Sequence, residues 1–176
     1  ADIAYNPTNA WQVLLTYTDE RCVPFDSPDS TRGELYRSGA LDMQHAPGLA
    51  LPLYLDDESP AEAVARASLL FTVRFDDRLD VVLLGLGPDG HIASLFPGHI
   101  DVGGEAPIAS LESSPKPPPQ RVTLTRSTLL RSTHNVVLAF GASKRDALQR
   151  ALNQDPALPT SGLPGLIFIT DQELSP

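Results

Sequence analysis

Short apolar runs separated by polar or proline-rich segments form the main pattern of this chain. Buried strands are predicted at Trp11–Tyr17, Leu49–Leu55, Asp80–Gly85, Asn135–Phe140 and Leu166–Thr170. These runs have the length of strands, and turn-forming residues flank several of them. Alternation and β-branched residues predict two further edge or mixed strands, at Ile108–Glu112 and Arg121–Thr125.

Helices are predicted at Asp29–Leu41, from Ser59 to about Phe75, and at Ser143–Leu152. The second helix opens with a capping box in residues 59–62 (SPAE), in which proline takes the first helical position. Its spacing puts Ala63, Ala67 and Leu70 on one face. In the third helix Ser143 is the predicted N-cap.

Apolar strands that alternate with helices predict a single α/β domain, with a mostly parallel, Rossmann-like twisted sheet flanked by helices. A chain of 176 residues is long enough for one such domain with a sizeable core. Ligands of open α/β sheets bind outside the carboxyl ends of the strands. The polar residues that follow the predicted strands are therefore candidates for a site: Asp19, Glu20, Arg21, Asp89, His91, Lys144, Arg145 and Asp171.

The loop after the Asp80–Gly85 strand has the glycine spacing of a dinucleotide-binding fingerprint, with Gly85, Gly87 and Gly90. The context does not fit a dinucleotide. The acid at the expected separation, Glu105, precedes a strand instead of following one, and Pro88 removes an amide that a pyrophosphate could use. We therefore expect the glycines to form a tight turn close to a different ligand.

Two interpretations of His91 stand side by side. If His91 opens a helix after Gly90, the helix N-terminus disfavours its protonated form, and the neutral ring can act as a general base. Alternatively, His91 is a structural histidine that caps the turn. The residue types alone give both interpretations equal weight.

Cations gather at the predicted sheet edge. Lys144 and Arg145 lie in the first turn of a predicted helix, where a bound phosphate would favour them. Each is otherwise an ordinary solvated surface charge, but Arg21 and Arg121 at the same edge make an anion site plausible. Asp19 and Arg21 form either a surface ion pair or a ligand-orienting pair.

Composition narrows the classes of function. A formal charge of −9 argues against nucleic-acid or anionic-membrane partners, and no apolar run is long enough to span a bilayer. Cys22, the one cysteine, fits a reducing compartment and a small apolar packing role. No metal-binding motif occurs, and Ser94 lacks the context of a nucleophile elbow. The proline-rich segment 114–120 (SPKPPPQ) is predicted to be a stiff connector instead of a polyproline ligand.

Four segments taken together resemble the 6-phosphogluconolactonase family. They are TDERCVPFDSPDS (18–30), LLGLGPDGHIASLFPGH (83–99), SPKPPPQRVTLT (114–125) and AFGASKRDAL (139–148). They occur in the family's order and span most of the chain, and the histidine-loop motif is long and specific.

The resemblance implies a fold similar to the glucosamine-6-phosphate deaminase and ribose-5-phosphate isomerase group. It implies hydrolysis of 6-phospho-D-glucono-1,5-lactone in the oxidative pentose phosphate pathway, with no metal or organic cofactor. It also implies a cytoplasmic protein, monomeric or weakly homo-oligomeric, whose partner is the phosphosugar lactone.

The resemblance also assigns residues by motif. His91 would activate the attacking water, and Asp19 would orient the substrate or the base. Arg21 and Lys144 would hold the phosphate, with Arg121 as a further contact. The loop around the sugar would be shaped by Gly87, Asp89 and Gly90.

One feature of the sequence departs from the family pattern, and another separates lactonases from deaminases within it. The family begins with a strand and an S-G-G-[ST]-T-P loop, so we expect residues 1–176 to be one lactonase-like domain that lacks this segment and part of a C-terminal helix. Phe96 stands where related deaminases carry a catalytic glutamate, which favours lactone hydrolysis. Another phosphosugar enzyme and a non-catalytic phosphosugar-binding domain remain as alternatives.

Overall fold

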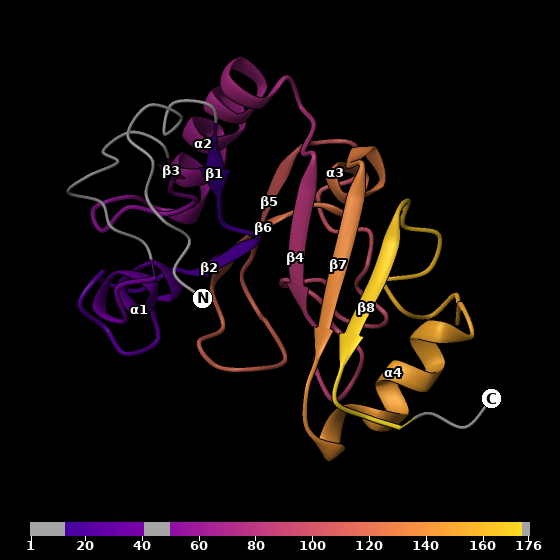
Figure 1. Ribbon diagram of the computed structural model, residues 1–176. Coiled ribbons are helices and arrows are strands. Elements are labelled where there is room, and N and C mark those ends of the chain that lie inside the picture. Colours follow the sequence, from indigo (N-terminus) through magenta and orange to yellow (C-terminus); the bar gives the residue numbers. More distant parts are fainter. Residues whose placement is uncertain (1–12, 41–49, 174–176) are drawn as a thin grey trace.

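A parallel sheet forms one half of the molecule (Figure 1). The structure is a computed structural model that describes residues 13–40 and 50–173. In the parallel sheet β7 (His134–Ala139) lies between β4 (Val81–Gly85) and β8 (Leu166–Thr170). Three predicted strands thus exist within a residue or two of their expected bounds, and the α/β class with a largely parallel sheet is confirmed.

The other half contains two smaller sheets. In an antiparallel sheet β6 (Arg121–Leu124) pairs with both β2 (Asp19–Arg21) and β5 (Ile108–Leu111). A two-residue strand β1 (Leu15–Thr16) pairs in parallel with β3 (Ala50–Leu51). Asp19 and Arg21 thus belong to a strand of their own, whereas the sequence analysis placed them after the end of the predicted Trp11–Tyr17 strand.

Helix α2 (Pro60–Phe75) begins as predicted. Ser59 caps it, and the side chain of Glu62 accepts a hydrogen bond from the backbone N–H of Ser59, which completes the capping box. The buried face is formed by Ala63, Ala67 and Phe71, at a spacing of four residues, whereas the predicted Leu70 is only partly buried. The face is therefore rotated slightly from the one expected.

Helix α1 (Thr31–Arg37) is shorter than the predicted Asp29–Leu41, although residue 41 lies outside the described ranges. Ser30 caps it, and the buried Glu20 carboxylate accepts hydrogen bonds from the backbone N–H groups of Thr31 and Arg32, at 2.8 and 2.7 Å. A carboxylate at this position satisfies free donors of the first turn. Glu20 therefore has a structural role on the side of β2 that faces α1.

The end of the chain that follows β7 differs in detail from the prediction. A short 3₁₀ helix, η2 (Ala142–Lys144), leads into α4 (Arg145–Leu152), and α3 (Arg126–Arg131) precedes β7. The N-cap of α4 is Lys144, without a side-chain cap, so the prediction of Ser143 as N-cap is wrong. The preceding 3₁₀ turn places Ser143 one residue too early to cap.

The predicted buried strand Trp11–Tyr17 is largely wrong for its described part. Val13, Leu14 and Leu15 are exposed, and only Tyr17 is buried. These residues line an open groove of about 870 Å³, together with β4 and the end of α2. In the described part of the chain β1 is paired along one edge only.

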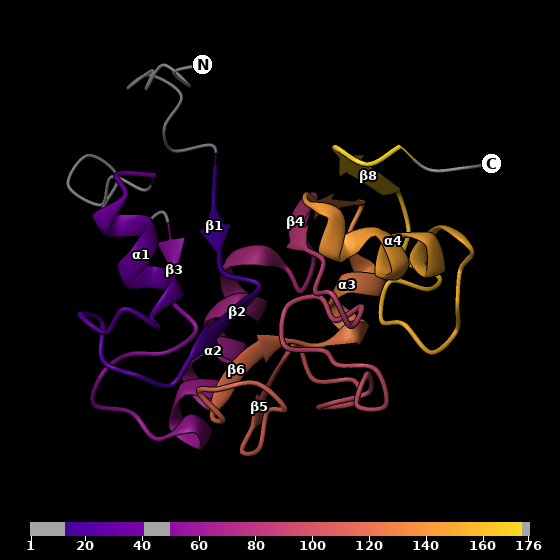
Figure 2. The same cartoon turned by 90° about the horizontal axis from the view of Figure 1, so that it is seen from below.

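The two faces of the parallel sheet differ in how far they are covered by helices. In Figure 2, α3 and α4 lie on one side of the sheet, and no helix of the described ranges covers the other. The register places Leu83, Val136 and Ile167 in one row of the uncovered face, and Leu83 is 61% exposed. The alternate residues Val82 and Leu84 are buried in the core.

Candidate active site

The loop after β4 is folded by backbone hydrogen bonds around His91. The N–H of Gly87 donates to the carbonyl of His91 at 2.8 Å, and the N–H of Gly90 donates to the carbonyl of Gly87 at 2.9 Å. A Cβ atom on Gly87 would overlap the His91 imidazole, and Gly90 has φ +90°. Both glycines are therefore needed for the close approach and the turn that place the histidine.

The predicted helix after Gly90 is wrong. Residues beyond His91 form two isolated bridges, Ile92 with Leu95 and Phe96 with His99. Ile92, Leu95 and Phe96 are all buried, so tertiary packing determines the backbone of this segment.

The His91 ring nonetheless favours its neutral form, as expected from the sequence, but for a different physical reason. Burial lowers its pKa, and the nearby Lys116 adds to that decrease, while Asp89 and Asp19 act in the opposite direction. The ring stacks on Phe96, with 4.8 Å between the centroids. The imidazole is therefore held neutral by desolvation and not by a helix N-terminus.

Asp89 and Lys116 complete a cluster at the same ring. The Asp89 Oδ1 atom lies 2.6 Å from Nδ1 of His91 and 3.0 Å from Nζ of Lys116. Burial alone would raise the pKa of Asp89, but hydrogen bonds with His91 and Lys116 lower it well below its usual range. Asp89 is thus a carboxylate that can fix the ring with Nδ1–H toward itself, which leaves Nε2 free.

Sequence reasoning did not select Lys116 for the site. It lies in the proline-rich segment between β5 and β6, which connects these strands as predicted. The sequence offered one signal for Lys116 as a site residue: it is one of only two lysines in the chain, and prolines flank it.

A second cluster lies on one face of the antiparallel sheet. Because side chains alternate along a strand, Asp19 and Arg21 point to the same face of β2, away from Glu20. Ser94 donates from Oγ to Oδ2 of Asp19 at 2.6 Å, and Nη1 of Arg121 lies 3.6 Å from the same carboxylate oxygen. Ser94 belongs to the loop of His91, so this cluster fixes that loop to the sheet.

Arg21 and Arg121 are direct cross-strand partners in the register of β2 and β6. Like charges opposite each other destabilise a strand pair. Arg21 donates from Nη1 to the carbonyl of Asp29 at 2.7 Å, but its buried Nε has no partner among the described residues. A bound anion would offset the repulsion between the two guanidinium groups and accept a hydrogen bond from the Arg21 Nε.

The guanidinium of Arg121 is fully engaged by the protein. It is 4% exposed and donates to the carbonyls of Lys116, Pro117 and Pro118 at 3.1 to 3.3 Å. Burial lowers its pKa, while the Asp19 carboxylate opposes that change. Arg121 therefore holds the proline-rich segment in place.

Lys144 and Arg145 follow the carboxyl end of β7. The start of the His91 loop lies beside this end, since the Leu86 N–H donates to the carbonyl of Leu138. The Lys144 side chain makes no hydrogen bond or ion pair with a described residue, and none links it to the His91 cluster. Arg145 donates to the carbonyl of Glu173 at 3.2 Å. The predicted site residues thus form two connected clusters, with Lys144 at the same sheet edge but outside both.

Other candidates play structural roles. The Asp171 carboxylate accepts a hydrogen bond from the Gly141 N–H at 2.9 Å and so supports the turn before η2. Burial raises the pKa of Cys22 to about 11, so its partly buried thiol stays protonated at neutral pH.

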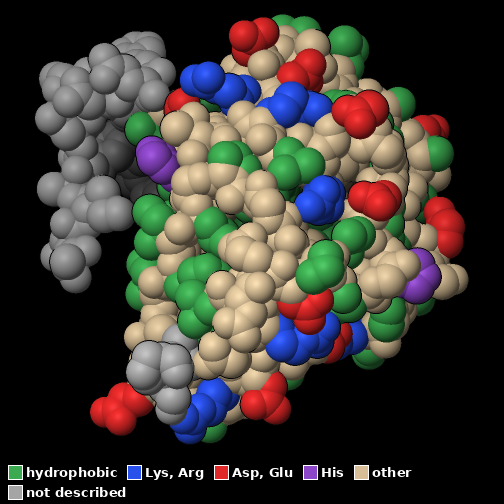
Figure 3. Space-filling model, turned by 90° about the vertical axis from the view of Figure 1, so that its right-hand side faces the viewer, with side chains coloured by type: hydrophobic (Ala, Val, Ile, Leu, Met, Phe, Trp, Pro, Cys, Tyr) green, Lys and Arg blue, Asp and Glu red, His purple; other side chains and the backbone are tan. Residues whose placement is uncertain are grey.

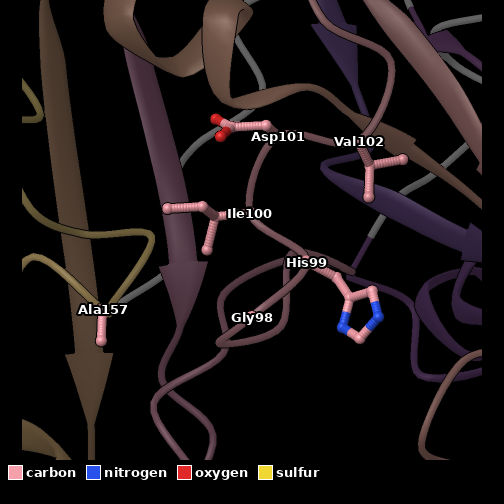
Figure 4. A pocket seen from close by; sticks show the side chains of 6 residues that line it. All are labelled: Gly98, His99, Ile100, Asp101, Val102 and Ala157. Carbon is pink, nitrogen blue, oxygen red and sulfur yellow. The ribbon is translucent and has the colours of Figure 1, made fainter.

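A separate hollow of about 490 Å³ lies between residues 98–102 and Ala157. In Figure 4 the imidazole of His99 and the carboxylate of Asp101 point in different directions, without converging on one ligand position. Its lining residues, all within the described ranges, include no Lys or Arg. This hollow does not suit a phosphorylated ligand.

The surface charges, the helices and the possible metal ligands add three observations. The face shown in Figure 3 carries Lys and Arg interspersed with Asp and Glu, without a continuous basic surface. No helix in the described ranges is long and apolar enough to cross a membrane. Within those ranges no group of three or more His, Cys, Asp or Glu side chains could hold a metal ion.

Comparison with known proteins agrees with the motifs. Residues 3–166 match the family described as glucosamine-6-phosphate isomerases/6-phosphogluconolactonase. The chain is 41% identical to a 6-phosphogluconolactonase of Rattus norvegicus over 162 residues and 37% identical to one of Homo sapiens over 159 residues. The alignments cover 88% and 87% of this chain, but the chain spans only 62% and 61% of those relatives' length.

Solved structures share the fold. The 6-phosphogluconolactonase of Thermotoga maritima superposes with a TM-score of 0.75 at 26% identity, over 90% of this chain and 72% of the other. A monomeric glucosamine-6-phosphate deaminase superposes with a TM-score of 0.71 at 20% identity, over the same shares of the two chains, which shows the fold alone. The predicted family resemblance is confirmed, and the chain belongs to the family of glucosamine-6-phosphate isomerases and 6-phosphogluconolactonases.

Proposed function

We propose that this protein hydrolyses 6-phospho-D-glucono-1,5-lactone to 6-phospho-D-gluconate, with His91 as the general base. The observation that carries the proposal is the Asp89–His91 contact of 2.6 Å, in which burial of the ring favours its neutral form and Nε2 makes no hydrogen bond with a described residue. Relatives named 6-phosphogluconolactonase support the choice of substrate.

In the proposed reaction, Nε2 of His91 accepts a proton from water as the water attacks the lactone carbonyl. The ring C–O bond then breaks, and the leaving sugar oxygen takes up the proton held by His91, which returns the imidazole to its neutral form. General-base assistance of this kind accelerates a reaction by roughly 10²–10⁴-fold. Asp89 fixes the ring orientation, and Gly87 and Gly90 allow the turn that places His91 beside the lactone. Asp19 acts through Ser94 on the position of the loop.

The phosphate is proposed to bind at Arg21 and Lys144. Arg21 has an unpartnered Nε among the described residues, and Lys144 has no partner there, so both can turn to a dianion. We give Arg121 a positioning role, because its guanidinium is buried and engaged by loop carbonyls. Clamping the distant phosphate orients the reacting carbonyl.

A deaminase or isomerase is the second candidate, since one solved deaminase shares the fold. Those reactions need a proton-transferring group beside the sugar. Phe96, which takes the position of the deaminase glutamate in the motif, is a buried apolar ring stacked on His91. This environment favours the lactonase.

The test is to follow acid release from freshly prepared 6-phosphogluconolactone, corrected for spontaneous hydrolysis, and ammonia release from glucosamine 6-phosphate in parallel. We expect acid release above the spontaneous rate and no ammonia. Ammonia release would replace the proposal with the deaminase, and binding of 6-phosphogluconate without either reaction would leave a binding domain.

A further inference from the structure

Lys116, the first of the two lysines in the chain, lies against the proposed base. Lys116 Nζ is 3.0 Å from Oδ1 of Asp89 and 3.3 Å from Nδ1 of His91. The three groups come from two loops, 25 residues apart in the case of Lys116 and His91. A cation beside an imidazole that must accept a proton calls for an explanation.

We propose that Lys116 is a positioning residue of this site, whose ammonium shares the Asp89 carboxylate with His91 and so keeps the imidazole in its neutral, proton-accepting form. The inference rests on the proposed function and deepens it. A carboxylate alone beside a histidine stabilises the imidazolium, which cannot act as a base. A shared ammonium offsets that effect while Asp89 still accepts the hydrogen bond from the ring.

The protein holds Lys116 in this position from the backbone side. Nη2 of Arg121 donates to the carbonyls of Lys116 and Pro117, at 3.3 and 3.1 Å. Nη1 of Arg121 in turn lies 3.6 Å from Asp19 Oδ2. The lysine is therefore built into the site through a buried guanidinium, which distinguishes it from a mobile surface charge.

The charges around the ring can be enumerated. Asp89 comes from the same loop, Lys116 from the proline-rich segment and Asp19 from β2, and Arg121 lies behind Asp19. The two carboxylates favour the imidazolium and the lysine opposes it. Removing Lys116 takes the cation away from Asp89, whose carboxylate then favours the imidazolium more strongly, so the pKa of His91 should rise.

The experiment compares Lys116→Met, Lys116→Arg and the wild-type protein, with Arg78→Met as a control at a cation that is 63% exposed and pairs only with Asp80 among the charges described. Proton NMR titration of the ring protons gives the pKa of His91, and the spectrum of His91→Gln assigns its signals. The same variants are assayed for kcat/KM against pH.

We expect Lys116→Met to raise the His91 pKa by about one unit and to move the acidic limb of kcat/KM by the same amount. Well below both pKa values the variant is then about tenfold slower. Lys116→Arg keeps the charge and should stay near the wild-type value, as should Arg78→Met.

An unchanged His91 pKa in Lys116→Met overturns the inference, as does an NMR shift without a matching shift of the kinetic limb. If the wild-type protein does not hydrolyse the lactone but the NMR shift occurs, the proposed function fails while the charge coupling stands. The titration therefore separates the two failures.

Discussion

The two cationic regions at the carboxyl edge of the sheets are built differently. Around His91, the charged side chains have partners in the protein: Asp89 is shared by His91 and Lys116, and Arg121 is engaged by Asp19 and three carbonyls, whereas Arg21 beside them is only partly engaged. At the end of β7, the Lys144 side chain has no partner among the described residues. A charge satisfied by the protein fixes geometry, whereas a charge without a protein partner is available to a ligand.

This contrast predicts that substitutions in the first region change turnover or stability, and that a substitution in the second changes substrate affinity.

His91→Ala should have the largest effect, with kcat lower by roughly 10²–10⁴-fold because the general base is lost. Its free energy of unfolding should stay within about 1 kcal/mol of wild type, measured by urea denaturation. Near-normal kcat in the folded variant would remove His91 from the mechanism.

Arg121→Met is the next largest. It removes the cation beside Asp19, whose carboxylate keeps the Ser94 hydroxyl as a donor, and it leaves the carbonyls of residues 116–118 without the guanidinium. We therefore expect a loss of about 3 kcal/mol in the free energy of unfolding. Urea denaturation measures the loss, and Arg150→Met, at an exposed ion pair with Asp155, is the matched control. A stability equal to that of the control would show that Arg121 does not anchor the segment.

Arg21→Met tests the intermediate case, since Arg21 has one backbone partner and one free Nε. Loss of a charged donor to phosphate should raise KM about tenfold, with kcat changed much less. Inhibition by inorganic phosphate should weaken in parallel. An equal fall in kcat with constant KM would place Arg21 with the groups that act on turnover.

Lys144→Met should give the smallest effect. We expect KM to rise about threefold, and stability to increase by about 0.3 kcal/mol, because a cation is removed from the N-terminus of α4. Steady-state kinetics and urea denaturation measure the two changes. A lower stability together with an unchanged KM would mean that Lys144 is structural, and the contrast between the regions would fail.

Local chemistry was readable from the sequence. The start of α2 follows from four residues that complete a capping box, and the strands of the parallel sheet follow from short apolar runs. Asp89 and His91 lie two residues apart in one loop, yet the sequence analysis gave Asp89 only a role in shaping the loop and did not predict its contact with the ring.

Long-range pairing was not readable. Lys116 reaches His91 because the register of β5 and β6 fixes the segment between them, and no local pattern specifies that register. The helix expected after Gly90 failed because burial of Ile92 and Leu95 outweighs local preference. The role of Arg121 depends on its burial, which a polar residue in a strand does not disclose.

The uncovered face of the parallel sheet, with Leu83, Val136 and Ile167 in one row, has a colloidal consequence. A net charge of −9 keeps molecules apart at low ionic strength, but added ammonium sulfate screens that repulsion and strengthens apolar association. The wild-type protein should therefore precipitate at a lower ammonium sulfate concentration than the Leu83→Lys variant. Light scattering measured against sulfate concentration compares the two.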